Sequence, residues 1–190
     1  MITRPQKKIA FIVPIVVAGL TLLLNCGKAA TSLIQNSEAK SPSGWSIKVV
    51  TVSQPATVNI KDRSSFGGTL PEKATSPAAN QSWVQVNVEM TPPSATTPLS
   101  AKQIKLMDGS NSYLALAMAS APDTGEPAFI YFKDSSGLAQ LSADGQIRWA
   151  ILNNKSTGDP EILFQKPGSE KVFLLFAVPS SAKGLSLQIS

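Results

Sequence analysis

The strongest constraint on the fold is an alternation of apolar and polar residues that recurs from Trp45 to the C-terminus. Residues 45–52 read WSIKVVTV and residues 83–90 read WVQVNVEM, with apolar side chains at every second position over much of each stretch. A period of two residues is that of a β-strand with one face against a core, whereas a helix repeats every three or four residues. Capped segments with a helical period are almost absent. The sequence therefore predicts an all-β domain.

Turn residues divide the rest of the domain into further strands. Residues 103–118 read QIKLMDGSNSYLALAM, in which Asp108-Gly109 predicts a tight turn between two strands. The SADG sequence at 142–145 separates another pair, and residues 128–132 and 185–189 read as single strands. Residues 171–179, KVFLLFAVP, are apolar on both faces, as in a central strand. We expect loops at 69–81 and 91–98, and about eight strands in a two-layer antiparallel sandwich.

The N-terminus has the composition of an export signal. Arg4, Lys7 and Lys8 precede an uncharged run at residues 9–24, IAFIVPIVVAGLTLLL. A basic start followed by a short apolar segment is typical of a secretory signal. The run is shorter than the ~20 residues of a permanent membrane span, and it contains Pro14. We predict a signal peptide over residues 1–25, with an uncleaved N-terminal anchor as the alternative.

The only cysteine of the chain, Cys26, follows this run. The sequence Leu23-Leu24-Asn25-Cys26 resembles the bacterial lipobox, although that family prefers Gly, Ala or Ser where this chain has Asn25. The resemblance implies cleavage before Cys26, a diacylglycerol on its sulfur and acylation of the new amine. Acyl chains anchor a protein because each buried methylene contributes ~0.8 kcal/mol. We therefore expect lipid on Cys26, no other cofactor, and a location on the extracytoplasmic side of the cell envelope; the alternative is an unmodified thiol after ordinary secretion.

Residues 26–43 are predicted to be a flexible tether. This segment has few large apolar residues and no aromatic residue, so it buries too little surface to offset chain entropy. The alternative is an irregular first strand that includes Leu33 and Ile34. Residues 44–190 then form one domain of ordinary size. Removal of the signal lowers the formal net charge from +5 to +2, because three basic residues leave with it. No basic patch remains in the sequence, so no nucleic-acid partner is predicted.

Three motifs of the domain resemble a known family. They are WSIKV at 45–49, LMDGSNSY at 106–113, and FAVP at 176–179 followed by LSL at 185–187. Together they look like the immunoglobulin-like (telokin-like) domain of secreted bacterial lipoproteins, which is largely of unknown function. The resemblance covers residues 45–189 and implies an immunoglobulin-like β-sandwich that is exported and tethered to a membrane. It implies no catalytic residue, and residues 57–81 are longer than the connection usual in that family.

The sequence offers few groups for catalysis or metal binding. It contains no histidine, which excludes triads and metal sites that need one. Its acidic residues are spread over predicted turns, so we expect no catalytic site. The DGSN sequence at 108–111 lacks the spacing of a calcium loop and is predicted to be a turn. Met90, Met107 and Met118 offer thioether ligands for a soft metal, but their dispersal favours core positions, and no metal site is predicted.

The three tryptophans separate into core and surface candidates. Trp45 and Trp149 are predicted core residues, whereas Trp83 shares a strand face with Gln85, Asn87 and Glu89. Trp83 could therefore be exposed, where it would stack on a glycan or anchor an envelope protein, but contact with a neighbouring loop is the favoured interpretation. The sequence thus predicts a membrane-tethered, non-catalytic binding or structural module. The alternatives are an envelope hydrolase that uses serine or carboxylate chemistry, and a methionine-based metal carrier.

Overall fold

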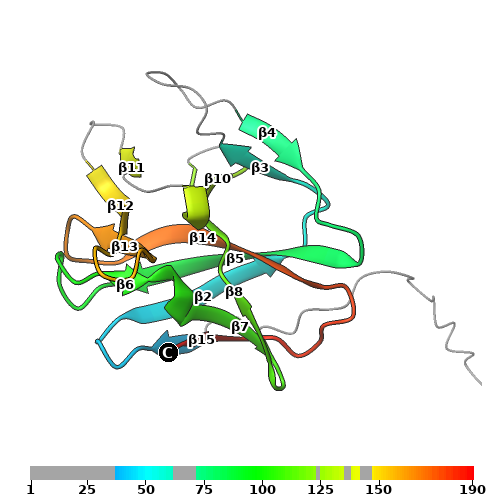
Figure 1. Ribbon diagram of the computed structural model, residues 1–190, viewed down its shortest axis with the longest axis horizontal. Coiled ribbons are helices and arrows are strands. Elements are labelled where there is room, and N and C mark those ends of the chain that lie inside the picture. The colour runs from blue at the N-terminus through cyan, green and yellow to red at the C-terminus, as the bar shows by residue number, and fades with distance from the viewer. Residues whose placement is uncertain (1–36, 62–71, 123–124, 135–137, 142–146) are drawn as a thin grey trace, which may run out of the picture.

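The computed structural model describes residues 37–61, 72–122, 125–134, 138–141 and 147–190. These residues form fifteen β-strands and two short 3-10 turns, and the strands form three sheets (Figure 1). The expected all-β class is confirmed. The predicted signal peptide, Cys26 and most of the predicted tether lie outside the described residues. Within the described ranges, no helix has the length and apolar character that a membrane span requires.

The largest sheet has eight strands, with β14 near its centre. In pairing order the strands are β1 (Glu38–Lys40), β2 (Ser46–Ser53), β5 (Gln81–Thr91), β14 (Glu170–Pro179), β9 (Ala117–Ser120), β10 (Ala128–Tyr131), β3 (Val58–Lys61) and β4 (Glu72–Thr75). β14 pairs with β5 on one side and β9 on the other, which confirms the central strand expected at 171–179. The strand pairings are otherwise antiparallel, as predicted, but β3 and β10 pair in parallel.

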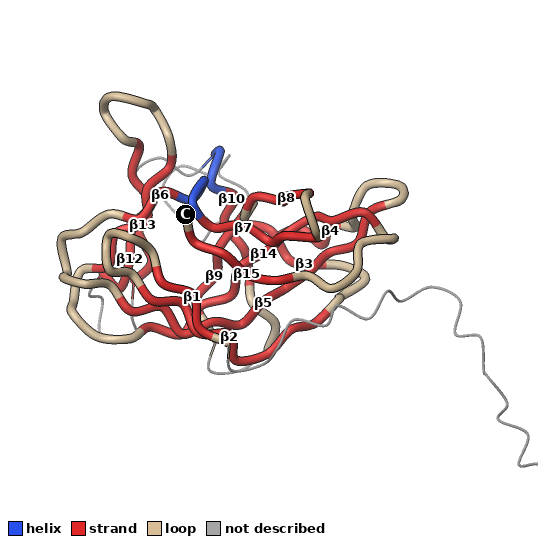
Figure 2. Tube along the Cα trace, turned by 90° about the horizontal axis from the view of Figure 1, so that it is seen from below, coloured by secondary structure: helices blue, strands red, loops and turns tan. Residues whose placement is uncertain are grey.

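Two smaller sheets form the second layer. One contains β11 (Leu138–Leu141), β12 (Ile147–Asn153), β13 (Pro160–Phe164) and β6 (Leu99–Ser100), and the other contains β15 (Ser186–Ile189), β7 (Ile104–Asp108) and β8 (Asn111–Leu114). The 3-10 turn η1 (Ala101–Gln103) joins β6 to β7, and a second turn, η2 (Phe132–Asp134), follows β10. Figure 2 shows both turns in blue, near β6 and β10. The chain between β6 and β7 therefore links the two smaller sheets.

The main core lies between the eight-stranded sheet and the second layer. Trp45 and Trp149 are buried in it, as predicted, and the ring centroids of Trp45 and Phe164 lie 5.4 Å apart. Met90 and Met118 are also buried in this core, as expected for core filling, whereas Met107 is half-buried. The apolar faces that alternation predicted for β2 and β5 point into this core, and the predicted β-sandwich is confirmed.

A second, smaller core covers the opposite face of the eight-stranded sheet. The sheet curls, so that β3 and β4 lie over the outer face of β5 and β14 (Figure 1). Trp83 belongs to this core and is 5% exposed, and its indole Nε1–H donates to the backbone carbonyl of Thr75 in β4 (3.0 Å). The interpretation of Trp83 as an exposed contact residue is wrong, because β4 forms within the predicted loop 69–81 and covers the ring. The favoured interpretation named a neighbouring loop, and the segment that Trp83 contacts is instead strand β4.

The folded chain begins before residue 44. β1 pairs with β2, with Ala39 opposite Ile47, although this segment was predicted to be tether. Ser41 is buried, and its Oγ accepts a hydrogen bond from the backbone N–H of Trp45 (3.0 Å). Residues 38–43 therefore belong to the domain. The sequence of β1, EAK, lacks an apolar alternation that would reveal it.

Candidate functional site

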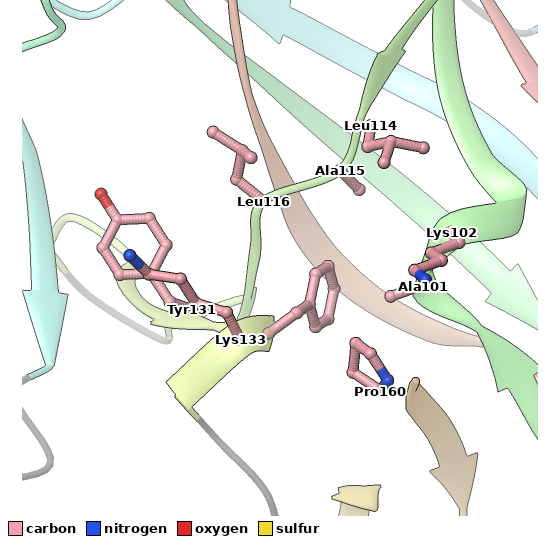
Figure 3. Close-up of a pocket in the computed structure, with 9 residues that line it drawn as sticks. Ala101, Lys102, Leu114, Ala115, Leu116, Tyr131, Lys133 and Pro160 are labelled. Atoms are coloured by element: carbon pink, nitrogen blue, oxygen red, sulfur yellow. The ribbon is translucent and has the colours of Figure 1, made fainter. Parts of the chain in front are cut away.

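A groove lies where the chain after β8 crosses from the second layer to the eight-stranded sheet. The backbone N–H of Ala115 still donates to Ile104 of β7 (3.0 Å), whereas that of Leu116 donates to Leu175 of β14 (2.8 Å). Beside this point opens a hollow of about 420 Å³, lined by residues 101–102, 114–116, 131–133 and 160 (Figure 3). We call it the crossover groove.

Buried apolar side chains and a backbone hydrogen bond fix the inner part of the groove. Ala101, Ala115 and Phe132 are all buried. The backbone N–H of Phe132 donates to the carbonyl of Leu116 (2.9 Å), which joins η2 to the crossover. The 3-10 turn η1 is closed by a hydrogen bond from the backbone N–H of Ser100 to the side-chain oxygen of Gln103 (3.3 Å). The Phe132–Leu116 hydrogen bond therefore holds η2 against the crossover, and the buried Ala101 anchors η1 in the main core.

Two exposed leucines lie at the edge of this buried surface. Leu114 is 43% exposed and Leu116 is 36% exposed. They are exposed because side chains alternate along the chain, and the intervening Ala115 points into the main core. A single exposed leucine is ordinary on a protein surface. Two of them beside a hollow whose volume falls in the ~300–1,000 Å³ range of small-molecule sites make this groove the candidate site.

The charged side chains that line the groove are two lysines, and Tyr131 adds a phenol. Lys102 Nζ lies 2.5 Å from Asp159 Oδ1, and the hydrogen bond from Lys102 holds the pKa of Asp159 below its ordinary value. Lys133 Nζ lies 5.6 Å from the centroid of the Tyr131 ring, which is a cation–π distance. Figure 3 shows Lys102 and Ala101 on one side of the groove, with Tyr131 and Leu116 on the other. Among the described lining residues no side chain is acidic.

Asp159 is positioned by the loop between β12 and β13. Asn154 organises this loop, because its Oδ1 accepts hydrogen bonds from the backbone N–H groups of Ser156 (2.8 Å) and Thr157 (3.0 Å). The backbone N–H of Asn154 donates to the carbonyl of Asp159 (2.8 Å). An aspartate fixed in this way holds the Lys102 ammonium beside the groove.

The residues singled out in the sequence do not line this groove. Cys26 lies outside the described residues, and Trp83 is buried in the second core. The DGSN sequence forms the predicted hairpin turn, with Asp108 opposite Asn111. In the described part of the chain, no group of three or more His, Cys, Asp or Glu side chains could hold a metal ion. A second hollow of about 190 Å³, which includes Gln85 and Glu126 in its lining, is separate from the crossover groove.

Sequence reasoning missed the groove, although one signal for it was present. The stretch YLALAM, residues 113–118, has apolar residues at both alternating sets of positions, so one of its faces had to place leucines at the surface or under another element. That stretch was interpreted only as a strand. Lys102, Phe132 and Pro160 complete the lining from distant parts of the chain, and no local pattern connects them.

Comparisons with known proteins identify no relative in sequence. The sequence matches no protein-family model, and it matches no curated protein. A solved structure described as an uncharacterized beta-sandwich protein from Clostridium difficile is similar with a TM-score of 0.35 and 8% sequence identity, over 85% of this chain and 95% of that chain. The β-sandwich assignment therefore rests on the sheets and cores of this chain itself.

Proposed function

We propose that the protein is an envelope lipoprotein whose β-sandwich is a non-catalytic binding module, with the crossover groove as its binding site. The observation that carries the binding role is the groove itself: exposed Leu114 and Leu116 adjoin a buried apolar surface, beside two lysine ammonium groups. An apolar hollow with a few polar groups is the usual form of a small-ligand site. The two-layer sandwich also supports the resemblance to the immunoglobulin-like domains of secreted bacterial lipoproteins.

The membrane tether is supported by the N-terminal sequence. A basic start, a short apolar run and the lipobox-like Leu23-Leu24-Asn25-Cys26 place a modifiable cysteine ahead of the domain. The lipid on Cys26 would hold the binding module at the extracytoplasmic face of a membrane. Metabolic labelling with a fatty acid, followed by intact mass measurement, tests this. We expect labelled wild type and unlabelled Cys26→Ala protein; an unlabelled wild type would contradict the anchor.

The groove is tested with a neutral apolar probe. The full chain in nanodiscs of neutral lipid is irradiated with a dodecanol that carries a photoreactive diazirine, and the labelled peptides are identified by mass spectrometry. We expect label on the peptide that contains residues 114–116. Leu116→Asp should reduce that label about tenfold or more, because a charge replaces an apolar contact in the site.

Leu152→Asp is the matched control for this experiment. Leu152 lies on β12, is 42% exposed and does not line the groove. The same substitution there should leave the label on residues 114–116 unchanged. Equal labelling of wild type and Leu116→Asp protein would show that the groove is not the binding site.

A further inference from the structure

We propose that the crossover groove binds a single aliphatic chain that ends in a carboxylate, with the carboxylate at Lys102 and the chain directed toward Leu116 and Tyr131. This inference rests on the proposed binding function of the groove and extends it by naming the chemical class of the ligand. The ligand is a free long-chain carboxylate rather than a bilayer surface.

The apolar part of the ligand follows from the shape and lining of the groove. Buried Ala115 and Phe132 and the partly exposed Leu114 and Leu116 offer an apolar surface that an aliphatic chain would remove from water. A volume of about 420 Å³ lies in the lower part of the ~300–1,000 Å³ range of ligand sites, which suits one chain. The apolar surface is hollowed, so it accepts a single chain better than it contacts a flat membrane.

The charged end of the ligand follows from charge complementarity. Lys102 and Lys133 are the charged residues that line the groove, beside the phenol of Tyr131, and no described lining residue is acidic. The Lys102 ammonium has three N–H donors, and its only carboxylate contact in the described residues is Asp159. Its side chain is 60% exposed, so further donors can reach a ligand. A carboxylate placed there would receive charge-assisted hydrogen bonds.

The position of Lys102 sets the direction in which the ligand's aliphatic chain lies in the groove. Figure 3 shows Lys102 on one side of the groove, Ala115 between the two leucines, and Leu116 and Tyr131 toward the other side. A carboxylate at Lys102 therefore leaves its chain to run along the apolar surface toward Leu116. Asp159 acts as a positioning residue in this arrangement, because its hydrogen bond holds the Lys102 ammonium beside the groove.

The test is competition against the photoreactive dodecanol, with the full chain in neutral-lipid nanodiscs. Unlabelled dodecanoate and unlabelled dodecanol share the chain and differ in the charged end. We expect dodecanoate to displace the probe from residues 114–116 at a concentration about tenfold lower than dodecanol does, because a charge-assisted hydrogen bond adds to the apolar contact. In Lys102→Met, the dodecanol concentration needed for displacement divided by the dodecanoate concentration should fall from about ten to about one.

Lys183→Met is the control, because Lys183 is an exposed lysine outside the groove, and it should keep the wild-type ratio. Equal competition by dodecanoate and dodecanol in the wild type would overturn the carboxylate assignment but leave the groove as a binding site. Absence of probe from residues 114–116 would overturn both proposals. Repeating the photolabelling in phosphatidylglycerol nanodiscs separates the membrane alternative: label on residues 114–116 that is weaker there than in neutral lipid and recovers in Lys102→Met, without a dodecanoate preference in the wild type, would assign the lysine to a lipid surface.

Discussion

At the scale of single residues, Trp83 combines two stabilising contacts in the second core. Its ring is almost fully buried between β5 and the β3–β4 pair, and its indole N–H donates to the Thr75 carbonyl. A buried indole needs such an acceptor, because an unpaired donor in the interior costs free energy. The same ring therefore attaches β4 to the sheet in two ways, by apolar packing and by a directional hydrogen bond.

Substitutions at Trp83 should separate these two contributions. Trp83→Phe keeps a ring but removes the donor, and we expect a loss of about 1–2 kcal/mol in the free energy of unfolding. Trp83→Ala also empties the site and should cost ~3–5 kcal/mol. Urea denaturation measures both. Equal losses for the two variants would contradict a packing role for the ring.

Lys102 and Asp159 provide a second prediction at this scale. The hydrogen bond from Lys102 lowers the pKa of Asp159 from its ordinary value of 3.8. A carboxylate with a lowered folded-state pKa adds stability above its unfolded pKa, and this contribution is lost as the pH falls through the folded pKa. Lys102→Met should raise the pKa of Asp159 toward 3.8, as measured by NMR titration of the carboxyl carbon.

Salt and a second lysine variant check that result. Because the pair lies at the surface, added salt should also raise the pKa of Asp159 in the wild type. Lys183→Met should leave the titration as in the wild type. If Lys102→Met had no effect on the titration, the ion pair would not be the cause of the low pKa.

At the scale of elements, the β7–β8 hairpin depends on one glycine. Asp108 and Asn111 face each other, so Gly109 and Ser110 form the two-residue turn. Gly109 has φ of +57°, in the left-handed region, and no atom lies within 4 Å of a Cβ placed there. The strain of a larger residue would therefore come from the backbone and not from a clash. The turn lies one residue later than Asp108-Gly109, the pair expected at its centre.

Substitution of Gly109 tests this account of the hairpin. Gly109→Ala should lower the free energy of unfolding by about 1–2 kcal/mol, because an L-residue resists a positive φ. Gly109→Asn should cost less, since asparagine adopts this region more readily. Urea denaturation of both variants measures the difference. A greater loss for Asn than for Ala would contradict the backbone explanation.

The length of an element decided whether the sequence revealed it. β5 and β14 are long enough for several repeats of the two-residue period, and both were predicted. β3 and β4 have four residues each, so alternation has at most two repeats to show. β13 begins at Pro160, a residue that usually indicates a break, although it is tolerated as the first residue of a strand. Two of these short strands also have distant partners, since β3 pairs with β10 and β13 pairs with β6.

At the scale of the whole molecule, one sheet serves two cores. β5 and β14 carry apolar side chains of the main core on one face and of the second core on the other, including Val84 and Trp83. Because the same two strands contribute side chains to both cores, loss of packing in one core also disturbs the strands that support the other. The described domain should therefore unfold as one unit, as single domains of this size usually do.

Tryptophan fluorescence can test this cooperativity. Trp45 and Trp149 report on the main core, and Trp83 reports on the second core. We expect urea transitions from fluorescence and from far-ultraviolet circular dichroism to coincide. The Trp83→Phe variant removes the reporter of the second core and should keep coincident transitions. An earlier fluorescence transition that disappears in Trp83→Phe would show that the second core unfolds by itself.

The candidate groove lay beyond prediction from the sequence. Its lysines, leucines and Phe132 come from η1, from the end of β8 with the crossover after it, and from η2, which are far apart along the chain. Alternation indicated that residues 113–118 form extended chain, but it could not show which element would leave Leu116 uncovered. The same limit applies to Trp83, whose polar neighbours in β5 indicated exposure before β4 was placed over it.

The sequence by itself determined the all-β class, the long strands and the hairpin at Gly109, because side-chain period and backbone preference act between near neighbours. Only the tertiary structure decided that β1 joins the domain, that Trp83 is buried and that a groove opens at Leu116. Each of these depends on where the large sheet curls and where β8 changes layers. Such placements are set by the packing of distant apolar surfaces, and no short stretch of the chain contains both partners.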